Sequence, residues 1–175
     1  MQTKRLTQQQ FSEREKKGHR WERVICGRLR LAGLDAHIPT EPTEFRPGPN
    51  DSFQFKMAFA DMWKDTKDII CNGEIVEVKG SSLEFTSTQD YPYKHVLIDS
   101  AMGHDQKKDK PFVHITVSYK TGCVIMLPGS TFPEWTRRMC KDRFVGQELK
   151  YQCHINRWLD WEPGLSFLRE ATKSY

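Results

Sequence analysis

The sequence has no long apolar run. No segment approaches the roughly 18 consecutive apolar residues that a membrane-spanning helix needs, and the N-terminal segment MQTKRLTQQQ is too polar for a secretory signal. We therefore expect a cytoplasmic protein with no membrane partner. The sequence also contains no internal repeat and no low-complexity segment.

Cysteine and histidine are present, but not in the usual patterns of a disulfide framework or a metal-binding motif; only Cys140, Cys153 and His154 form a loose cluster, which lacks an apparent fourth ligand for structural zinc. The five cysteines are an odd number and include no CxxC pair, which argues against a disulfide framework and a zinc ribbon. The six histidines form neither HxH nor HExxH, so neither a histidine-based nuclease nor a metalloprotease is expected. A phosphate loop of the type GxxxxGK[ST] is also missing, which argues against a phosphotransferase or nucleotide-binding domain.

The composition is that of a folded globular domain with a modest positive charge. Hydrophobic residues make up 37% and charged residues 29% of the 175 residues, which is enough for one core. We expect a single domain, residues 1–175, with its core at about 12–145 and a C-terminal tail, 146–175, docked on it. The formal net charge is +4, and the first 33 residues hold nine Lys and Arg against three acids. Such an excess is either a solvated helix face or a surface for nucleic acid.

Residues 12–32 have the pattern of one amphipathic helix. Ser12 and Glu15 form a capping-box pattern, and Gly33 gives a C-terminal stop. Glu22 lies beside the apolar stripe, where it could face a sheet or pair with a neighbouring arginine in solvent. The expected buried stripe consists of Trp21, Val24, Ile25, Leu29 and Ala32.

The stretch KDIICNGEIVEVK, residues 67–79, predicts a tight β-hairpin. Asn72-Gly73 favours a type I′ turn between two short β-type runs. Side chains alternate along a strand, so Glu77 and Lys79 are expected on one face and the valines beside them on the other. Asp68 is expected at the far end of the paired strand, level with or just beyond Lys79, where twist or a bulge would bring the three groups together.

Two acids and a lysine in this arrangement suggest a metal site. Asp68 and Glu77 would supply hard oxygen ligands for Mg²⁺ or Mn²⁺. A lysine beside the metal could orient an attacking water or help to deprotonate it, and could stabilise a pentavalent phosphate. The alternative is an exposed hairpin face that carries a Glu-Lys cross-strand pair of small energetic value.

Asp68 followed, after a hairpin turn, by Glu77-Val78-Lys79 resembles the core motif of the PD-(D/E)XK nuclease superfamily. Lys67 stands where the family often has proline, which is a departure that the family tolerates. Family members often carry an acid on the first helix ahead of a glycine, and Glu22 ahead of Gly33 matches that feature.

The resemblance covers roughly residues 18–128 and implies a restriction-endonuclease-like core, in which a helix precedes a three-stranded meander. It implies a metal-dependent DNA endonuclease. Asp68, Glu77 and the Val78 carbonyl would hold one or two Mg²⁺ or Mn²⁺ ions, and Glu22 would complete the shell directly or through water. Lys79 would position the hydrolytic water against the phosphorus, and the products would carry a 5′-phosphate.

Several other residues are candidates for contacting nucleic acid. Gln89 and Tyr93 weakly resemble an arrangement found in some nucleases of the superfamily, although an ordinary polar loop explains them too. Residues 134–143 can form a short basic helix that faces either DNA or solvent. The candidate set is Lys17, Arg20, Arg23, Ser81, Gln89, Tyr93, Arg137 and Arg138.

The remaining segments complete an α/β fold of α+β order, with a mixed central sheet flanked by helices. The segment 53–63 is compatible with a strand, a short helix or a lid. Expected strands are 35–38 and 95–100, together with a hairpin of 112–119 and 123–127. A turn is expected at 80–82 and a charged loop at 103–110.

The main functional alternative is a non-catalytic nucleic-acid-binding module with a nuclease-like fold. Sequence-specific, structure-specific and exonucleolytic cleavage stay open, as does the choice between DNA and RNA. A recombination or repair nuclease, a junction resolvase and a restriction or homing enzyme all fit this length. A phage or other mobile element would place the protein in the host-cell cytoplasm. A homodimer or higher homo-oligomer is expected if both strands of a duplex are cut.

Overall fold

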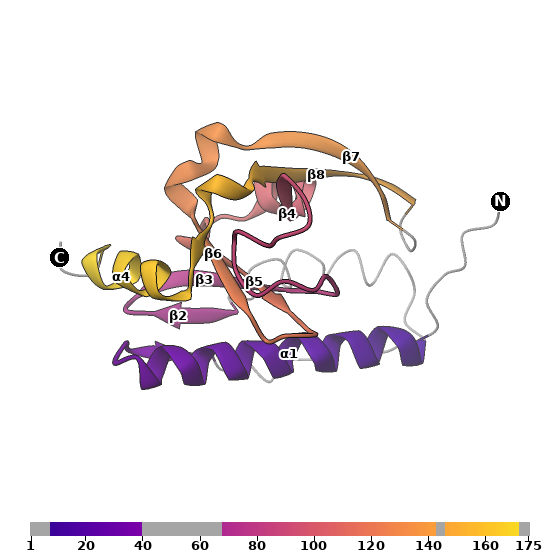
Figure 1. Ribbon diagram of the computed structural model, residues 1–175. Helices are drawn as coiled ribbons and strands as arrows, with labels where there is room; N and C mark the ends of the chain where they lie inside the picture. Colours follow the sequence, from indigo (N-terminus) through magenta and orange to yellow (C-terminus); the bar gives the residue numbers. More distant parts are fainter. Residues whose placement is uncertain (1–7, 40–67, 143–145, 172–175) are drawn as a thin grey trace.

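A long helix, a six-stranded sheet and a three-stranded sheet form successive layers (Figure 1). The computed structural model describes residues 8–39, 68–142 and 146–171, and the side chains of 20–39, 68–141 and 147–170. The expected α/β fold with a mixed sheet is confirmed. The segment 53–63 lies outside the described residues. Among the helices that are described, none has the length and apolar character needed to cross a membrane.

Helix α1 (Gln8–Leu31) forms the first layer. It begins ahead of the capping box expected at Ser12, so the predicted start is wrong. Gly33 ends the helix as predicted, with a positive φ of 81° that glycine adopts without strain. The N–H of Leu34 donates to the Leu29 carbonyl at 3.1 Å, the bond from beyond the helix end that characterises this type of terminus.

The buried face of α1 is rotated relative to the predicted stripe. Ile25 and Leu29 are fully buried, as predicted, but Val24 is 40% exposed and Cys26 is buried in its place. Consecutive helical positions are about 100° apart, so Val24 and Cys26 cannot both face the sheet fully. Glu22 lies one turn before Cys26, which turns the glutamate toward the sheet side of the helix.

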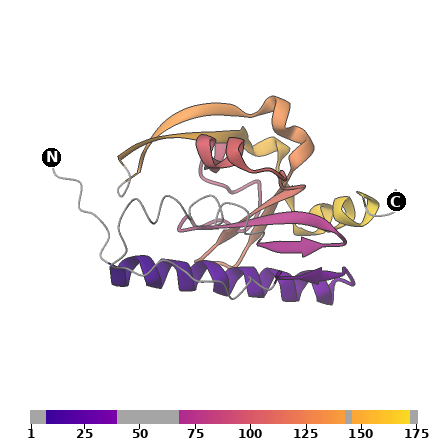
Figure 2. The same cartoon turned by 180° about the vertical axis from the view of Figure 1, so that it is seen from behind.

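The second layer is a six-stranded sheet in the order β1-β2-β3-β5-β6-β9. All neighbouring strands are antiparallel except β3 and β5, which are parallel, so the sheet is mixed. The chain between β3 and β5 crosses the face opposite α1 (Figure 2). The strands are β1 (Ala36–His37), β2 (Ile69–Cys71), β3 (Glu74–Ser81), β5 (Val113–Ser118), β6 (Val124–Pro128) and β9 (Leu159–Asp160).

The predicted β2–β3 hairpin is present, with a tight turn at Asn72-Gly73. Both residues have positive φ, 49° and 86°, as a type I′ turn requires. The Asn72 Oδ1 accepts from the Asp35 N–H at 2.8 Å, and the Asn72 N–H donates to the Asp35 carbonyl at 2.6 Å. These two bonds fix the turn to the segment that leads into β1.

Strand β3 continues through Gly80 to Ser81, so the turn expected at 80–82 begins too early. Its parallel pairing with β5 reaches Ser81 opposite Ser118, which extends the strand. The absence of a side chain at Gly80 is required by packing, because a Cβ there would lie 1.7 Å from the Tyr119 Oη.

The third layer is a three-stranded antiparallel sheet in the order β4-β8-β7. It consists of β4 (His95–Ser100), which was predicted, and of β7 (Thr136–Asp142) and β8 (Gly146–His154). The helix predicted at 134–143 is wrong: β7 pairs with β8 along its whole length, and this tertiary pairing overrides local helix propensity.

Short helices connect the strands. Helix α3 (Ala101–Gln106) replaces part of the charged loop expected at 103–110. Its N-cap Ser100 accepts from the Gly103 N–H at 2.8 Å. Two 3₁₀ helices, Gly129–Glu134 and Ile155–Arg157, flank the three-stranded sheet.

Two hydrophobic cores separate the layers. One lies between α1 and the six-stranded sheet and includes Ile25, Leu29 and Val76. The other lies between the two sheets and joins Ile125 of β6 to Val96 of β4. Residues 146–171 supply the middle strand of the small sheet, the edge strand β9, and helix α4 (Trp161–Ala171), which adds two leucines to the first core.

The rotated face of α1 predicts unequal effects of truncation on stability. Leu29→Ala should lower the free energy of unfolding by about 2–5 kcal/mol, because it removes a fully buried side chain. Val24→Ala should change it by about 0.5 kcal/mol or less, because Val24 is exposed. Urea unfolding of both variants measures the difference, and equal losses would contradict the observed helix orientation.

Candidate active site

Glu77 and Lys79 lie on the face of β3 away from α1. Val76 is fully buried in the core beneath the sheet, and Val78 packs against that core, so the predicted alternation is confirmed. Glu77 is only 7% exposed, whereas the Lys79 side chain is 40% exposed. The exposed-hairpin alternative therefore does not describe Glu77.

Asp68 lies directly before β2 and closer to Glu77 than expected. The hairpin pairs Ile69 with Val76, so the next position places Asp68 opposite Glu77. The position predicted for it, level with or beyond Lys79, is wrong because the two-residue turn fixes a tighter register. The Asp68 Oδ2 accepts a 2.7 Å hydrogen bond from the Val78 N–H.

Glu22, Asp68 and Glu77 form a cluster of acids at this end of the hairpin. Burial raises the pKa of Asp68 to about 7, and the negative charges of Glu77 and Glu22 add to the increase. The hydrogen bond from Val78 and the charge of Lys79 oppose it. The helix acid and the hairpin motif are thus close enough in space to influence the same carboxyl.

Two lysines and two acids form an ion-pair quartet next to Asp68. The Lys79 Nζ lies 3.0 Å from the Glu77 Oε1 and 3.1 Å from the Asp99 Oδ1. The Lys107 Nζ lies 2.8 Å from the Glu77 Oε2 and 2.8 Å from the Asp99 Oδ2. Each carboxylate oxygen therefore has one ammonium partner.

The quartet keeps Glu77, Asp99 and Lys79 charged. Burial would raise the pKa of Glu77, but Lys79 and Lys107 hold it below its usual value. The same two lysines lower the pKa of Asp99 to about 2 despite its burial. Burial would lower the pKa of Lys79, but Glu77 and Asp99 raise it well above its ordinary value. Lys79 is therefore a protonated hydrogen-bond donor at neutral pH and not a base.

Sequence reasoning missed Asp99 and Lys107. Asp99 lies near the end of β4, and Lys107 follows α3. An acid inside the otherwise apolar stretch HVLIDS was a usable signal, because a carboxylate next to buried positions needs a partner. Lys107 carried no comparable signal, because it belongs to the charged segment QKKDK.

His114 is buried beside the quartet and lies opposite Glu77 in the parallel pairing of β3 and β5. Burial lowers the pKa of His114 to about 3, and the charge of Glu77 only partly offsets this. Its ring packs against Trp135 and His104, with centroid distances of 5.1 and 5.9 Å. His114 is therefore a neutral core residue and supplies no proton near pH 7.

The donor chemistry of the site suits a hard divalent cation, but the ligands are not assembled around one. Asp68 is a carboxyl beside two other acids, whose charges a cation would compensate, and its Oδ2 is held in place by the backbone. Both oxygens of Glu77, however, face lysines. Within the described part of the chain, no three His, Cys, Asp or Glu side chains form a ready-made metal site.

A cleft of about 720 Å³ adjoins the quartet at Lys79. One wall of the cleft is formed by β3 and the loop after it (residues 79–83). The start of β4 and the two residues before it (93–97) form a second wall, and β7 (138–141) forms the third. We call this the basic cleft. Ser81, Tyr93 and Arg138, three of the residues predicted to contact nucleic acid, line it.

The other predicted nucleic-acid residues are not part of this cleft. Arg137 donates to the Tyr151 Oη at 2.7 Å and lies 3.1 Å from the Asp105 carboxylate. Gln89 is exposed on a loop that is fixed by its own hydrogen bonds to Asp90. The last three belong to α1: Arg20 and Arg23 are exposed, and the side chain of Lys17 lies outside those described.

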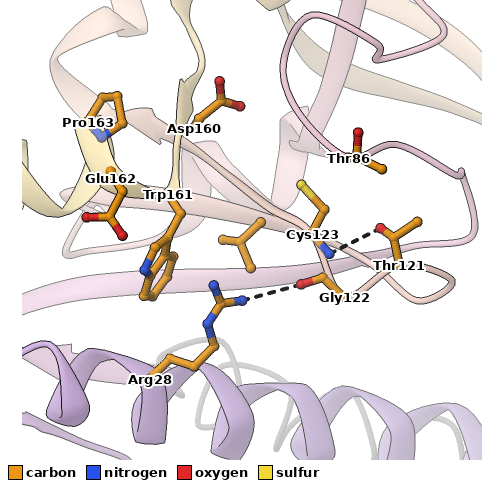
Figure 3. Close-up of a pocket in the computed structure, with 10 residues that line it drawn as sticks. Arg28, Thr86, Thr121, Gly122, Cys123, Asp160, Trp161, Glu162 and Pro163 are labelled. Atoms are coloured by element: carbon orange, nitrogen blue, oxygen red, sulfur yellow. Dashed lines mark hydrogen bonds between the residues drawn. The ribbon is translucent and has the colours of Figure 1, made fainter.

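A second cavity, of about 450 Å³, lies where α1, α4 and the β5–β6 turn meet (Figure 3). Arg28 stacks on the Trp161 ring at 4.0 Å and donates to the Gly122 carbonyl at 3.3 Å. The Asp160 carboxylate is bound by the Thr88 N–H at 2.7 Å. Because Arg28 and Asp160 link α1, the β5–β6 turn, the loop at Thr88 and the segment before α4, this cavity is a junction between elements of the fold.

Comparison with known proteins does not assign the site. The chain matches no model of a known protein family, and no curated protein sequence is similar to it.

Stability should depend on pH through Asp68. Its pKa of about 7 in the folded protein exceeds the ordinary 3.8, so its stabilising contribution is complete below about pH 4 and is lost as the pH rises through 7. In metal-free buffer, wild type should lose more stability between about pH 4.5 and 7.5 than Asp68→Asn does. Urea midpoints at several pH values test this. Glu84→Gln, at an exposed carboxyl, should behave as wild type.

The quartet should show strong energetic coupling. Lys107→Ala leaves Glu77 and Asp99 with one ammonium between them and should cost about 3 kcal/mol. Adding Asp99→Ala should recover part of that loss, because the uncompensated acid is then gone. A double-mutant cycle by urea unfolding measures the coupling. Strictly additive losses would show that the quartet does not act as a unit.

Proposed function

We propose that the protein is a metal-dependent deoxyribonuclease that hydrolyses phosphodiester bonds of DNA as an endonuclease. The observation that carries this proposal is the convergence of Glu22, Asp68, Glu77 and Lys79 from three separate elements. These are the residues that the resemblance to the PD-(D/E)XK superfamily selects. The approach of Glu22 was not a necessary result of the sequence pattern, because a solvated glutamate on the helix would have stayed apart from the hairpin.

The topology supports the same proposal. Helix α1 is followed by three consecutive antiparallel strands, β1, β2 and β3, as in the helix and meander of the restriction-endonuclease-like core. The short helix α3 then leads to β5, which pairs with β3 in parallel. Glu77 and Lys79 thus lie on an interior strand of the sheet, with a paired strand on each side.

Asp68 and Glu77 would hold a Mg²⁺ or Mn²⁺ ion, with Glu22 and the Val78 carbonyl as further ligands. When bound, such an ion would neutralise charge on the phosphate and make an attacking water more acidic. To bind it, Glu77 must release one of its two ammonium partners. Burial and the nearby charges of Glu77 and Glu22 disfavour the ionised form of Asp68, and a bound cation would relieve both effects.

Lys79 would act as a charged donor toward the substrate. Its protonated ammonium reaches the cleft while it contacts Glu77 and Asp99, so it can orient a water or a phosphoryl oxygen. Asp99 would be a positioning residue, since it holds Lys79 from the side opposite Glu77. Lys107 would keep Asp99 ionised when Glu77 changes partner.

A non-catalytic nucleic-acid-binding module is the second candidate. It is favoured by the same contacts of Glu77, whose two oxygens are neutralised by lysines without any metal. In this alternative the acids and lysines only stabilise the fold, and the basic cleft binds nucleic acid without cleavage.

Cleavage assays separate the two functions. Linear, circular, single-stranded and branched DNA are incubated with the protein and with Mg²⁺, Mn²⁺ or EDTA. We expect cleavage only with metal, and a decrease of about 100-fold or more in Asp68→Ala and Lys79→Ala because each removes charge stabilisation of the transition state. Glu84→Gln, at an exposed carboxyl outside the reacting groups, serves as the control.

Circular dichroism establishes that each variant is folded before its activity is compared. Cleavage that survives EDTA, or that is unchanged in the folded Asp68 and Lys79 variants, would contradict the proposed chemistry. DNA binding without metal-dependent cleavage of any substrate would favour the binding module.

A further inference from the structure

The basic cleft carries positive charge without counter-charge. Lys79, Lys94, Arg138 and Lys141 line it, and no Asp or Glu is among the lining residues. Lys79 is neutralised by the quartet, but among the described residues no ion pair involves Lys94, Arg138 or Lys141. Three such cations on facing walls make the cleft complementary to a polyanion.

Apolar and aromatic groups are exposed between these cations. Tyr93 is 60% exposed and Met139 is 57% exposed. The Tyr91 ring contacts Tyr93 edge-on, with a centroid distance of 6.5 Å. Tyr91 itself packs on the buried Phe85, with a centroid distance of 5.1 Å. An aromatic ring fixed in this way next to free cations is the combination that binds a base and its phosphates.

The size of the cleft indicates one strand rather than two. Its volume of about 720 Å³ falls in the range of about 300–1,000 Å³ that encloses small ligands. A few nucleotides of a single strand fit such a space, whereas a base-paired duplex does not. Bases in a single strand also expose the faces that Tyr93 would stack on.

We infer that the basic cleft binds a single strand of DNA, with Tyr93 stacked on a base and with Lys94, Arg138 and Lys141 on its phosphates. The strand leads to Lys79, which belongs both to the cleft and to the quartet. The inference rests on the proposed function for what happens to the strand there. The substrate would then be single-stranded or locally unpaired DNA.

Fluorescence anisotropy with a labelled oligothymidylate, measured in EDTA, tests binding without cleavage. Tyr93→Ala should weaken binding by about tenfold, whereas Tyr93→Phe should bind as wild type because it keeps the ring. Arg138→Ala/Lys141→Ala should weaken binding and reduce the slope of log K against log salt by about 0.7 for each lost phosphate contact.

Lys108→Ala/Lys120→Ala is the matched control, because it removes the same charge from exposed positions outside the cleft. Equal weakening by the control pair and the cleft pair would overturn the inference, since binding would then depend on overall charge. Tighter binding of a matched duplex than of the single strand would overturn it as well. So would displacement of the oligonucleotide by polyglutamate at equal charge concentration.

The binding assay and the cleavage assay fail independently. If the cleft variants weaken binding in EDTA but no DNA is cleaved with metal, the nuclease proposal is wrong and the cleft assignment stands. If cleavage requires Asp68 and Lys79 but the cleft variants bind as wild type, the cleft assignment is wrong and the nuclease proposal stands.

Discussion

The buried charge of Glu77 is the constraint on which the site depends. A carboxylate on the interior strand of a sheet is costly unless cations compensate it. Lys79 supplies one from the same strand, and Lys107 supplies the other from the segment after α3. Asp99 then balances both lysines, so β4 and α3 are held over β3 by electrostatics as well as by the core between the sheets.

This arrangement links the fold to the proposed chemistry. The crossover between β3 and β5 must pass over the face that carries Glu77, and it brings β4 and α3 with it. The same crossover forms a wall of the basic cleft through the residues before β4. Strand β7 closes the cleft from the other side, so the basic cleft and the acid cluster share Lys79 as their common residue.

The two acids of the hairpin, Asp68 and Glu77, have different surroundings and opposite pKa shifts. Glu77 has two ammonium partners and a lowered pKa, whereas Asp68 has a backbone hydrogen bond, two acidic neighbours and a raised pKa. Opposite shifts in neighbouring carboxyls are typical of functional sites, although structural ion pairs produce them too. Here burial is the main cause of the increase at Asp68, whereas at Glu77 the two lysines outweigh burial.

Local patterns in the sequence determined the hairpin, its turn and the faces of its side chains. Asn72-Gly73 permits the positive φ angles of the turn, and alternation places Glu77 and Lys79 together without reference to the rest of the chain. The end of α1 at Gly33 and the buried pair Ile25 and Leu29 were predictable for the same reason.

Only the tertiary structure decided the partners of these groups. Asp99 and Lys107 reach Glu77 through a parallel crossover that no local pattern specifies. Residues 136–142 are a strand and not a helix, because they pair with β8 along their whole length, and this long-range pairing overrides local helix propensity. The preference of a segment for a turn or for a strand face depends on neighbouring residues, whereas the pairing of distant strands depends on the free energy of the whole fold.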